Sequence, residues 1–154
     1  MNYTEYKDKV LAELNEQLSS FDERMVDQFV EELAHKRCAN ICAYGAGRMG
    51  YGLRAFIMRL IHLGYHAYWY TDTTIPHMGP NDMFLFASGS GKTQTVVKLA
   101  EIAKEKTGTR IVSVTGDVGS PLAQLSDLVI KFKGCNNGLN SENSPDKINS
   151  IQPM

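Results

Sequence analysis

Several features that would place a protein in a special class are missing from this chain. Only three cysteines occur among 154 residues, in neither a C-x-x-C pair nor an even-numbered set, which is typical of reduced, buried thiols in a cytoplasmic protein. No apolar run approaches the length of a membrane span, and the first residues lack the apolar core of a signal peptide. The 16 lysines and arginines nearly balance the 17 aspartates and glutamates, without a long basic run. The sequence therefore predicts a cytoplasmic protein that binds neither nucleic acid nor a membrane.

Two common ligand-binding patterns are incomplete. Three histidines are spaced too irregularly for a metal site, and no nearby cysteine or carboxylate completes one: His62, His66 and His77. Gly91-Lys92-Thr93 resembles the end of a P-loop, but Phe86 occupies the position that requires a further glycine. We therefore expect no metal ion and no hydrolysis of ATP or GTP.

The remaining sequence has the composition of one globular domain. Its hydrophobic content of 43% is enough for a single core. Apolar residues recur at helical spacing in some segments and form short strand-like runs in others. We predict helices over about 2–19, 22–36, 49–63 and 121–126, a helix that follows the loop at 88–93 and ends near 106, and strands over 41–44, 67–70, 84–87, 110–115 and 128–130.

This alternation of strands and helices predicts the fold. It requires right-handed crossovers, which give a parallel sheet with helices on both faces. The predicted fold class is α/β, a three-layer α/β/α sandwich with a five-stranded parallel sheet in flavodoxin-like order. Ligands of such sheets bind at the carboxyl ends of the strands. We divide the chain into N-terminal helices over 1–38, which pack on the domain or on a partner subunit, a core over 39–132, and a polar tail over 133–154.

The loop over 88–93 is the first candidate site. Its glycines allow a sharp turn that exposes backbone N–H groups. Ser88, Ser90 and Thr93 add hydroxyl donors at the positive end of the following helix dipole, which suits a phosphate. The same residue types also cap helices in the absence of any ligand, so the loop alone leaves that alternative open.

A glycine turn, Gly45-Ala46-Gly47-Arg48-Met49-Gly50, follows the first predicted strand and is the second candidate site. It matches the dinucleotide fingerprint G-x-G-x-x-G, and Asp72 ends the next strand, where an acid would contact a ribose. NAD binding is therefore an alternative, although the chain leaves little room for a separate catalytic domain. In flavodoxin-like order this turn and the loop over 88–93 are neighbours, so we expect a ligand between them.

Four segments together resemble a known family: Ala43–Arg48, Met58–Gly64, Ser88–Thr93 and Ile151–Met154. In this order and at these spacings they are similar to the 6-phospho-3-hexuloisomerases of the sugar isomerase (SIS) domain family. The resemblance implies a phosphosugar at the strand ends and a homo-oligomer, a tetramer or a dimer, with sites near subunit contacts. It also implies a cytoplasmic isomerase that interconverts 3-hexulose 6-phosphate and fructose 6-phosphate through an enediolate, without a cofactor.

The resemblance also assigns roles to individual residues. It implies that the substrate and its phosphate are bound by Gly45, Gly47, Arg48, Ser88, Gly89, Ser90 and Thr93. His62 falls on the histidine of the family's MRL-x-H motif and is the candidate for acid–base work or ring opening. Asp72 and Thr115 are further candidates for loop contacts. For His62 and Arg48, the residues alone equally allow an exposed side chain near a helix end.

The chain departs from the family pattern in several places. Lys92 replaces a usual Glu, Met49 a usual Ser and Asp72 a usual Glu, and the loop after Thr115 lacks an Asn-Pro pair. In the family, the Gln-Pro-Met segment leads into a helix that carries the favoured catalytic base, and this sequence ends at Met154. We therefore expect phosphosugar binding to be retained more readily than isomerisation. Two alternatives remain: a sugar-phosphate-binding SIS module without catalysis, and a fragment of an NAD-binding oxidoreductase.

Overall fold

The computed structural model describes residues 2–36 and 39–132, so the predicted tail over 133–154 lies outside the described residues. The helices are α1 (Tyr3–Leu18), α2 (Glu23–Lys36), α3 (Gly47–His62), α4 (Gln94–Thr107) and α5 (Pro121–Leu125). The strands are β1 (Ile41–Gly45), β2 (Ala67–Trp69), β3 (Met83–Ala87), β4 (Arg110–Thr115) and β5 (Leu128–Lys131). These bounds lie close to the predicted ranges because the spacing of apolar residues changes at each boundary.

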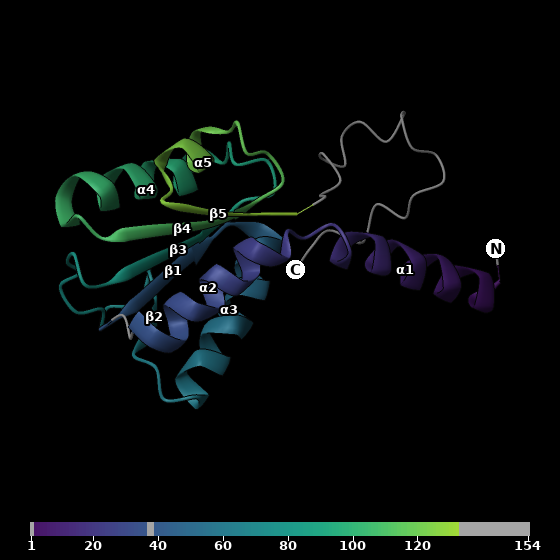
Figure 1. The fold of residues 1–154 in the computed structure, drawn as a ribbon, viewed down its shortest axis with the longest axis horizontal. Coiled ribbons are helices and arrows are strands. Elements are labelled where there is room, and N and C mark those ends of the chain that lie inside the picture. The colour runs from purple at the N-terminus through teal and green to yellow at the C-terminus, as the bar shows by residue number, and fades with distance from the viewer. Residues whose placement is uncertain (1, 37–38, 133–154) are drawn as a thin grey trace.

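The strands form one parallel sheet in the order β2-β1-β3-β4-β5. β1 and β3 are neighbours in the sheet, and Gly45 at the end of β1 lies opposite Ala87 at the end of β3. Helices α2 and α3 cover one face of the sheet, and α4 and α5 cover the other (Figure 1). The predicted three-layer sandwich with flavodoxin-like order is therefore confirmed, and the strand order reverses between β1 and β3.

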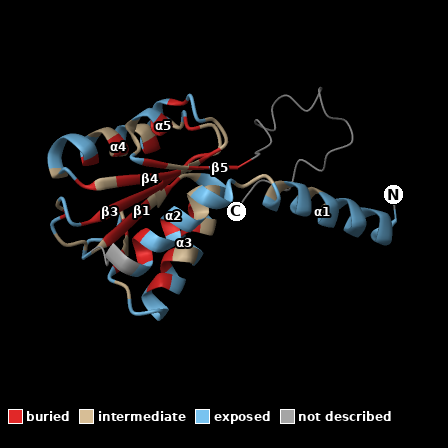
Figure 2. Ribbon diagram, in the orientation of Figure 1, coloured by how far each residue is buried: buried red, intermediate tan, exposed pale blue. Residues whose placement is uncertain are grey.

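The core lies in two layers, one on each face of the sheet. Met83 and Leu85 of β3 pack on the side of α2 and α3, whereas Phe84 and Phe86 pack on the side of α4 and α5. The rings of Phe84 and Phe86 stack with their centroids 5.5 Å apart. Because both faces are covered, β3 is buried along its whole length, as Figure 2 shows, and its sequence is a continuous apolar run.

The two N-terminal helices relate differently to the sheet. Phe29 and Leu33 of α2 belong to the core, whereas no residue of α1 is buried and α1 extends away from the domain (Figures 1 and 2). A capping box begins α1: Asn2 Oδ1 accepts from the backbone N–H of Glu5, and Glu5 Oε2 accepts from that of Asn2.

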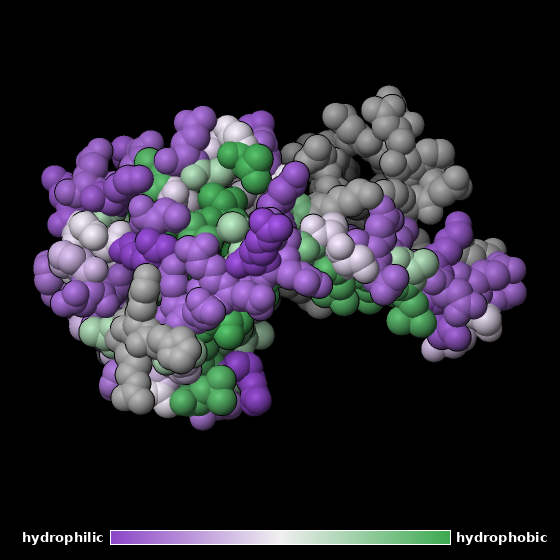
Figure 3. Space-filling view, in the orientation of Figure 1, coloured by the Kyte–Doolittle hydropathy of each residue, from purple (hydrophilic) through white to green (hydrophobic). Residues whose placement is uncertain are grey.

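Figure 3 shows hydrophobic residues exposed along α1. The large hydrophobic side chains that α1 leaves exposed are Tyr3, Tyr6, Leu11, Leu14 and Leu18. The packing of this part of the segment 1–38 on a partner subunit stays a prediction.

Two residues near the sheet have structural roles. Asp82, 6% exposed, precedes β3 at the amino-terminal edge and accepts hydrogen bonds from the backbone N–H groups of Asn40 (2.8 Å) and Gly79 (2.7 Å). Burial raises the pKa of the Cys42 thiol in β1 to about 12, so Cys42 is the inert, buried cysteine that we predicted. Cys38 and Cys135 lie outside the described residues.

Within the described ranges, none of the helices has the length and apolar character needed to cross a bilayer.

Candidate functional site

The loop between β3 and α4 is held in a tight turn by its own hydroxyl groups. Ser88 is 3% exposed, and its Oγ accepts a hydrogen bond from the backbone N–H of Gly91 at 3.1 Å. The hydroxyls of Ser88 and Thr93 are hydrogen-bonded to each other at 2.9 Å. Ser90 Oγ accepts from the backbone N–H of Lys92 at 3.2 Å. We call residues 88–93 the phosphate loop, because this is the segment that the sequence predicts to hold a phosphate.

The N-terminus of α4 is open at the end of this loop. Thr93 is the N-cap residue, yet its side chain makes no capping hydrogen bond to the helix. Its hydroxyl is instead directed to Ser88. Thr93 therefore does not cap α4 through its side chain, and phosphate binding by this loop stays a prediction. An uncapped helix N-terminus presents N–H donors and a positive dipole end to an anion.

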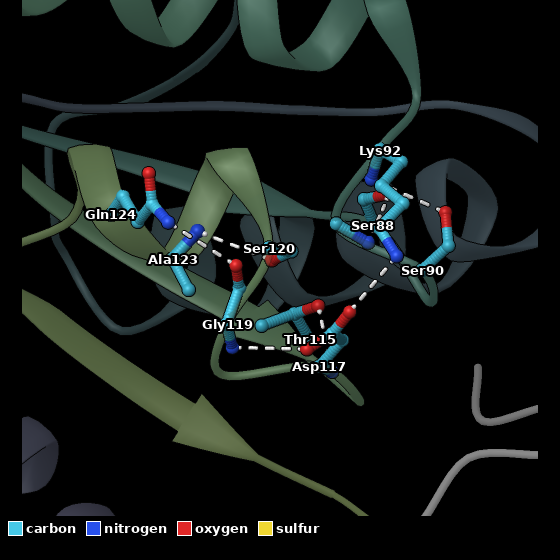
Figure 4. Close-up of polar contacts among 10 residues, drawn as sticks. Ser88, Ser90, Lys92, Thr115, Asp117, Gly119, Ser120, Ala123 and Gln124 are labelled. Carbon is cyan, nitrogen blue, oxygen red and sulfur yellow. Dashed lines mark hydrogen bonds and ion pairs between the residues drawn. The ribbon is translucent and has the colours of Figure 1, made fainter.

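A second loop, residues 116–120 after β4, packs against the phosphate loop (Figure 4). The backbone N–H of Gly116 donates to the carbonyl of Gly89 at 3.0 Å, and that of Leu122 donates to the carbonyl of Gly91 at 3.2 Å. Across the same contact, Lys92 Nζ lies 3.2 Å from Asp117 Oδ2. The hydrogen bond from Lys92, followed by that from the backbone N–H of Gly119, holds the pKa of Asp117 below its usual value.

The glycine turn brings the start of α3 close to the phosphate loop. A Cβ on Gly45 would lie 3.1 Å from the carbonyl oxygen of Ala87, the residue before Ser88. A Cβ on Gly50 would lie 2.2 Å from the carbonyl oxygen of Gly45, so only glycine lets α3 approach the end of β1 this closely. Ala46, the N-cap of α3, provides no side-chain cap. Two uncapped helix N-termini thus follow neighbouring strands at the switch point.

A pocket of about 570 Å³ opens beside the glycine turn, at the ends of β1 and β2. Its lining is Tyr44, Gly45, Ala46, Gly47, Gly50, Tyr51, Arg54, Trp69 and Thr71. The guanidinium carbon of Arg54 lies 4.5 Å from the centre of the Trp69 ring, a cation–π contact that holds the cation at the pocket wall. Sequence reasoning missed Arg54 and Trp69, although the only tryptophan of the chain, at the end of a strand, was a usable signal.

The remaining predicted residues are spread around this edge, with one exception. Arg48 is exposed in the first turn of α3, and Asp72 is exposed after β2. Thr115 is buried at the end of β4, where its Oγ1 accepts from the backbone N–H of Asp117 at 3.3 Å. His62, by contrast, is the exposed last residue of α3, about 22 Å along the axis from Gly47 at 1.5 Å per residue. Within one chain, His62 and the phosphate loop are therefore far apart.

No metal centre accompanies these loops in the part of the chain that the structure describes. Within residues 2–36 and 39–132 there is no group of three or more His, Cys, Asp or Glu side chains placed to hold a metal ion. Backbone N–H groups, hydroxyls and three cationic side chains, Arg48, Arg54 and Lys92, lie beside these loops and the adjoining pocket.

The fold is a doubly wound α/β sheet with two open helix N-termini at its switch point, the place where proteins of this class bind ligands and where helix N-termini favour anions. The chain belongs to the SIS domain family, which matches residues 51–135. The resemblance read from the four sequence segments is thereby confirmed at the level of the family.

Individual relatives agree with this assignment. The chain is similar to 3-hexulose-6-phosphate isomerases from Mycobacterium gastri (50% identical over 86 residues, 56% of this chain and 43% of the relative) and Bacillus subtilis (29% identical over 154 residues, 100% of this chain and 80% of the relative). It is also similar to the crystal structure of a Methanococcus jannaschii protein from which a 3-hexulose-6-phosphate isomerase function has been inferred (30% identical, TM-score 0.64, 74% of this chain and 63% of that chain). The chain spans about half the length of the first curated relatives that it matches, 56%, 51% and 43%.

Proposed function

We propose that this chain is the sugar-phosphate-binding part of a phosphosugar isomerase that interconverts 3-hexulose 6-phosphate and fructose 6-phosphate. The observation that carries the proposal is the open N-terminus of α4 behind the phosphate loop, next to the open N-terminus of α3. The similarity to 3-hexulose-6-phosphate isomerases supports the choice of substrate. The few cysteines support a cytoplasmic location. Neither NAD binding nor a binding module without catalysis is favoured by the comparisons.

In this proposal the phosphate loop binds the phosphate of the sugar. The backbone N–H groups at the start of α4 and the hydroxyls of Ser88, Ser90 and Thr93 supply hydrogen-bond donors to the phosphate oxygens. The rest of the sugar extends toward the glycine turn, which follows the neighbouring strand about 4.8 Å away. Gly45 and Gly47 let the backbone approach the sugar closely, and Arg48 adds a positive charge.

The proposed reaction moves the carbonyl group by one carbon. A base removes the proton from C2 of the 3-ketose, and the electron pair forms a 2,3-enediolate. The hydroxyl proton then moves from O2 to O3, and return of the first proton at C3 leaves the carbonyl at C2. This chemistry needs a base beside the carbons and donors for the oxygen that gains negative charge. The N–H groups of the α3 N-terminus are the proposed donors, and isomerisation of this kind needs no cofactor.

His62 is the proposed acid–base or ring-opening residue, and its position imposes a condition. The length of α3 separates it from the glycine turn of its own chain. We therefore propose that the protein is a homo-oligomer, a dimer or a tetramer, in which His62 serves the site of a neighbouring copy. The apolar side chains of α1 support such an assembly, because Tyr3 is 81% exposed and Leu18 is 68% exposed in a single copy.

A thermal-shift titration tests the proposal. Fructose 6-phosphate is compared with free fructose, inorganic phosphate and NAD. At about 100 times the Kd, a ligand that binds only the folded state adds roughly 2.7 kcal/mol of stability. We expect stabilisation by fructose 6-phosphate and little by fructose or NAD, followed by turnover in an isomerase assay. Stabilisation by NAD alone would contradict the proposal and assign the glycine turn to a dinucleotide.

A further inference from the structure

Lys92 lies near the end of the phosphate loop and forms an ion pair with Asp117. It directly precedes Thr93, the N-cap of α4, so its backbone lies where an anion at this helix would be held. Its side chain crosses to the loop after β4, where Nζ lies 3.2 Å from Asp117 Oδ2 (Figure 4). A cation that a phosphate would attract is thus engaged by a carboxylate of the protein itself.

The side chains of Lys92 and Asp117 differ in how far other contacts restrict their movement. Asp117 is fixed by its own turn, because its Oδ1 accepts from the backbone N–H of Gly119 at 2.9 Å and its backbone N–H donates to Thr115 Oγ1. Lys92 has a long side chain that is 64% exposed, against 39% for Asp117. If the ion pair breaks, Lys92 is therefore the side chain that moves, while Asp117 stays hydrogen-bonded in its turn.

We infer that Lys92 is a specificity-determining residue. When a ligand binds, Lys92 gives up its ion pair with Asp117 and binds the phosphate of the ligand instead. Asp117 therefore competes with the ligand for this cation. The inference rests on the proposed phosphosugar function and deepens it. The equilibrium constant for forming an exposed ion pair is only about two to five, whereas a phosphate dianion at an open helix end forms stronger, charge-assisted hydrogen bonds. Asp117 thereby makes the loop selective for ligands with enough charge to displace it.

Substitutions at the two positions have opposite expected effects on the Kd for fructose 6-phosphate, measured by calorimetry. Lys92→Met raises the Kd about tenfold, the scale of one charge-assisted contact. Asp117→Asn lowers the Kd about two- to fivefold, because asparagine can keep the turn through its Oδ1 but no longer holds the lysine. Lys98 and Glu101 form a similar exposed pair on α4, 2.9 Å apart, so Lys98→Met and Glu101→Gln are controls with the same charge changes and an expected Kd equal to the parent's.

A double variant separates this inference from a simpler explanation. If Lys92 only neutralises Asp117, adding Lys92→Met to Asp117→Asn leaves the Kd unchanged, and that result overturns the inference. If Lys92 contacts the phosphate and Asp117 acts only by competing for it, the same addition raises the Kd about 20- to 50-fold, up to the Kd of Lys92→Met alone. An Asp117→Asn variant that binds no more tightly than the parent also overturns the inference. Failure of the parent to bind fructose 6-phosphate, while the variants remain folded, overturns both the inference and the proposed function.

Discussion

Gly91 lies in close contact with the residues that follow β4. Its φ of 63° is left-handed, and a Cβ would lie 2.0 Å from Ser120 Oγ and 2.9 Å from Thr115 Oγ1. Ser120 cannot move away freely, because its side chain accepts from the backbone N–H of Ala123 and caps α5. Glycine is therefore required here both by the backbone conformation and by the space available.

The variant Gly91→Ala tests this requirement. We expect a loss of about 3 kcal/mol in the free energy of unfolding, from left-handed strain and from overlap with Ser120. Urea denaturation measures the loss. Gly89→Ala is the matched control, since a Cβ on Gly89 would meet nothing within 4 Å and its φ is not in the left-handed region. Equal stability of the two variants would contradict this account of Gly91.

Ser88 and Ser90 allow the roles of a buried and a half-exposed hydroxyl to be compared. Ser88→Ala leaves the backbone N–H of Gly91 without its side-chain acceptor, so we expect about 1 kcal/mol of lost stability and weaker binding of fructose 6-phosphate. Ser90→Ala removes a more exposed bond to Lys92, so binding weakens with less effect on stability. Denaturation and calorimetry on both variants measure the two effects. Unchanged affinity for fructose 6-phosphate in both variants would contradict the assignment of phosphate binding to this loop.

At the scale of residues, the parts of the candidate site that depend on short sequence motifs could be predicted from the sequence. The hydroxyl and glycine positions of the phosphate loop and the glycine turn follow from short motifs, and the structure places both at one edge of the sheet. The Lys92–Asp117 pair and the Arg54–Trp69 contact join residues from different loops and elements. Such contacts depend on how distant segments pack, which apolar spacing and motif patterns do not specify.

At the scale of elements, α2 is fastened to the sheet by an ion pair as well as by its apolar side. The carboxylate of Glu32 is almost fully buried and receives both Nε and Nη2 of Arg110 at the start of β4. A buried carboxylate depends strongly on a cationic partner, because loss of that ion pair removes a large part of what offsets the cost of taking the charge out of water.

Arg110→Met therefore destabilises the protein by about 3 kcal/mol, measured by urea denaturation. The double variant Glu32→Met with Arg110→Met should recover most of this loss, because it also removes the buried charge and leaves two apolar side chains in contact. A double variant that is as unstable as Arg110→Met alone would show that the pair contributes packing rather than charge compensation.

The elements themselves were the most predictable part of the fold. β3 is a continuous apolar run because both of its faces are covered, and α4 ends at Gly108, which is left-handed with φ of 63°. These signals are local, and right-handed crossovers then limit the strand orders that are possible. The direction of α1 was not predictable, because an amphipathic pattern specifies an apolar side but not the surface that covers it.

At the scale of the whole molecule, the exposed apolar side of α1 provides a test of the proposed homo-oligomer. Leu14 lies near the middle of its exposed apolar side, whereas Ala12 lies on the opposite side of the same helix. If a second copy covers the apolar side, Leu14→Glu dissociates the oligomer, because it places a charge in an apolar interface. Ala12→Glu adds the same charge and leaves the oligomer intact. Light scattering after size-exclusion chromatography measures both masses, and a parent protein that is monomeric would contradict the proposal.

The position of His62 gives the proposed oligomer a functional consequence. Because α3 separates His62 from the glycine turn of its own chain by about 22 Å, a catalytic role requires that it serve a neighbouring copy. His62→Gln should then slow turnover more than it weakens the binding of fructose 6-phosphate, since the phosphate loop stays intact. Oligomers mixed from His62→Gln and Ser88→Ala subunits should regain part of the parent's turnover, because some sites then receive an intact loop from one copy and an intact histidine from another. A His62→Gln variant with the parent's turnover would remove His62 from the mechanism, and mixed oligomers no more active than their components would place both residues in the site of one chain.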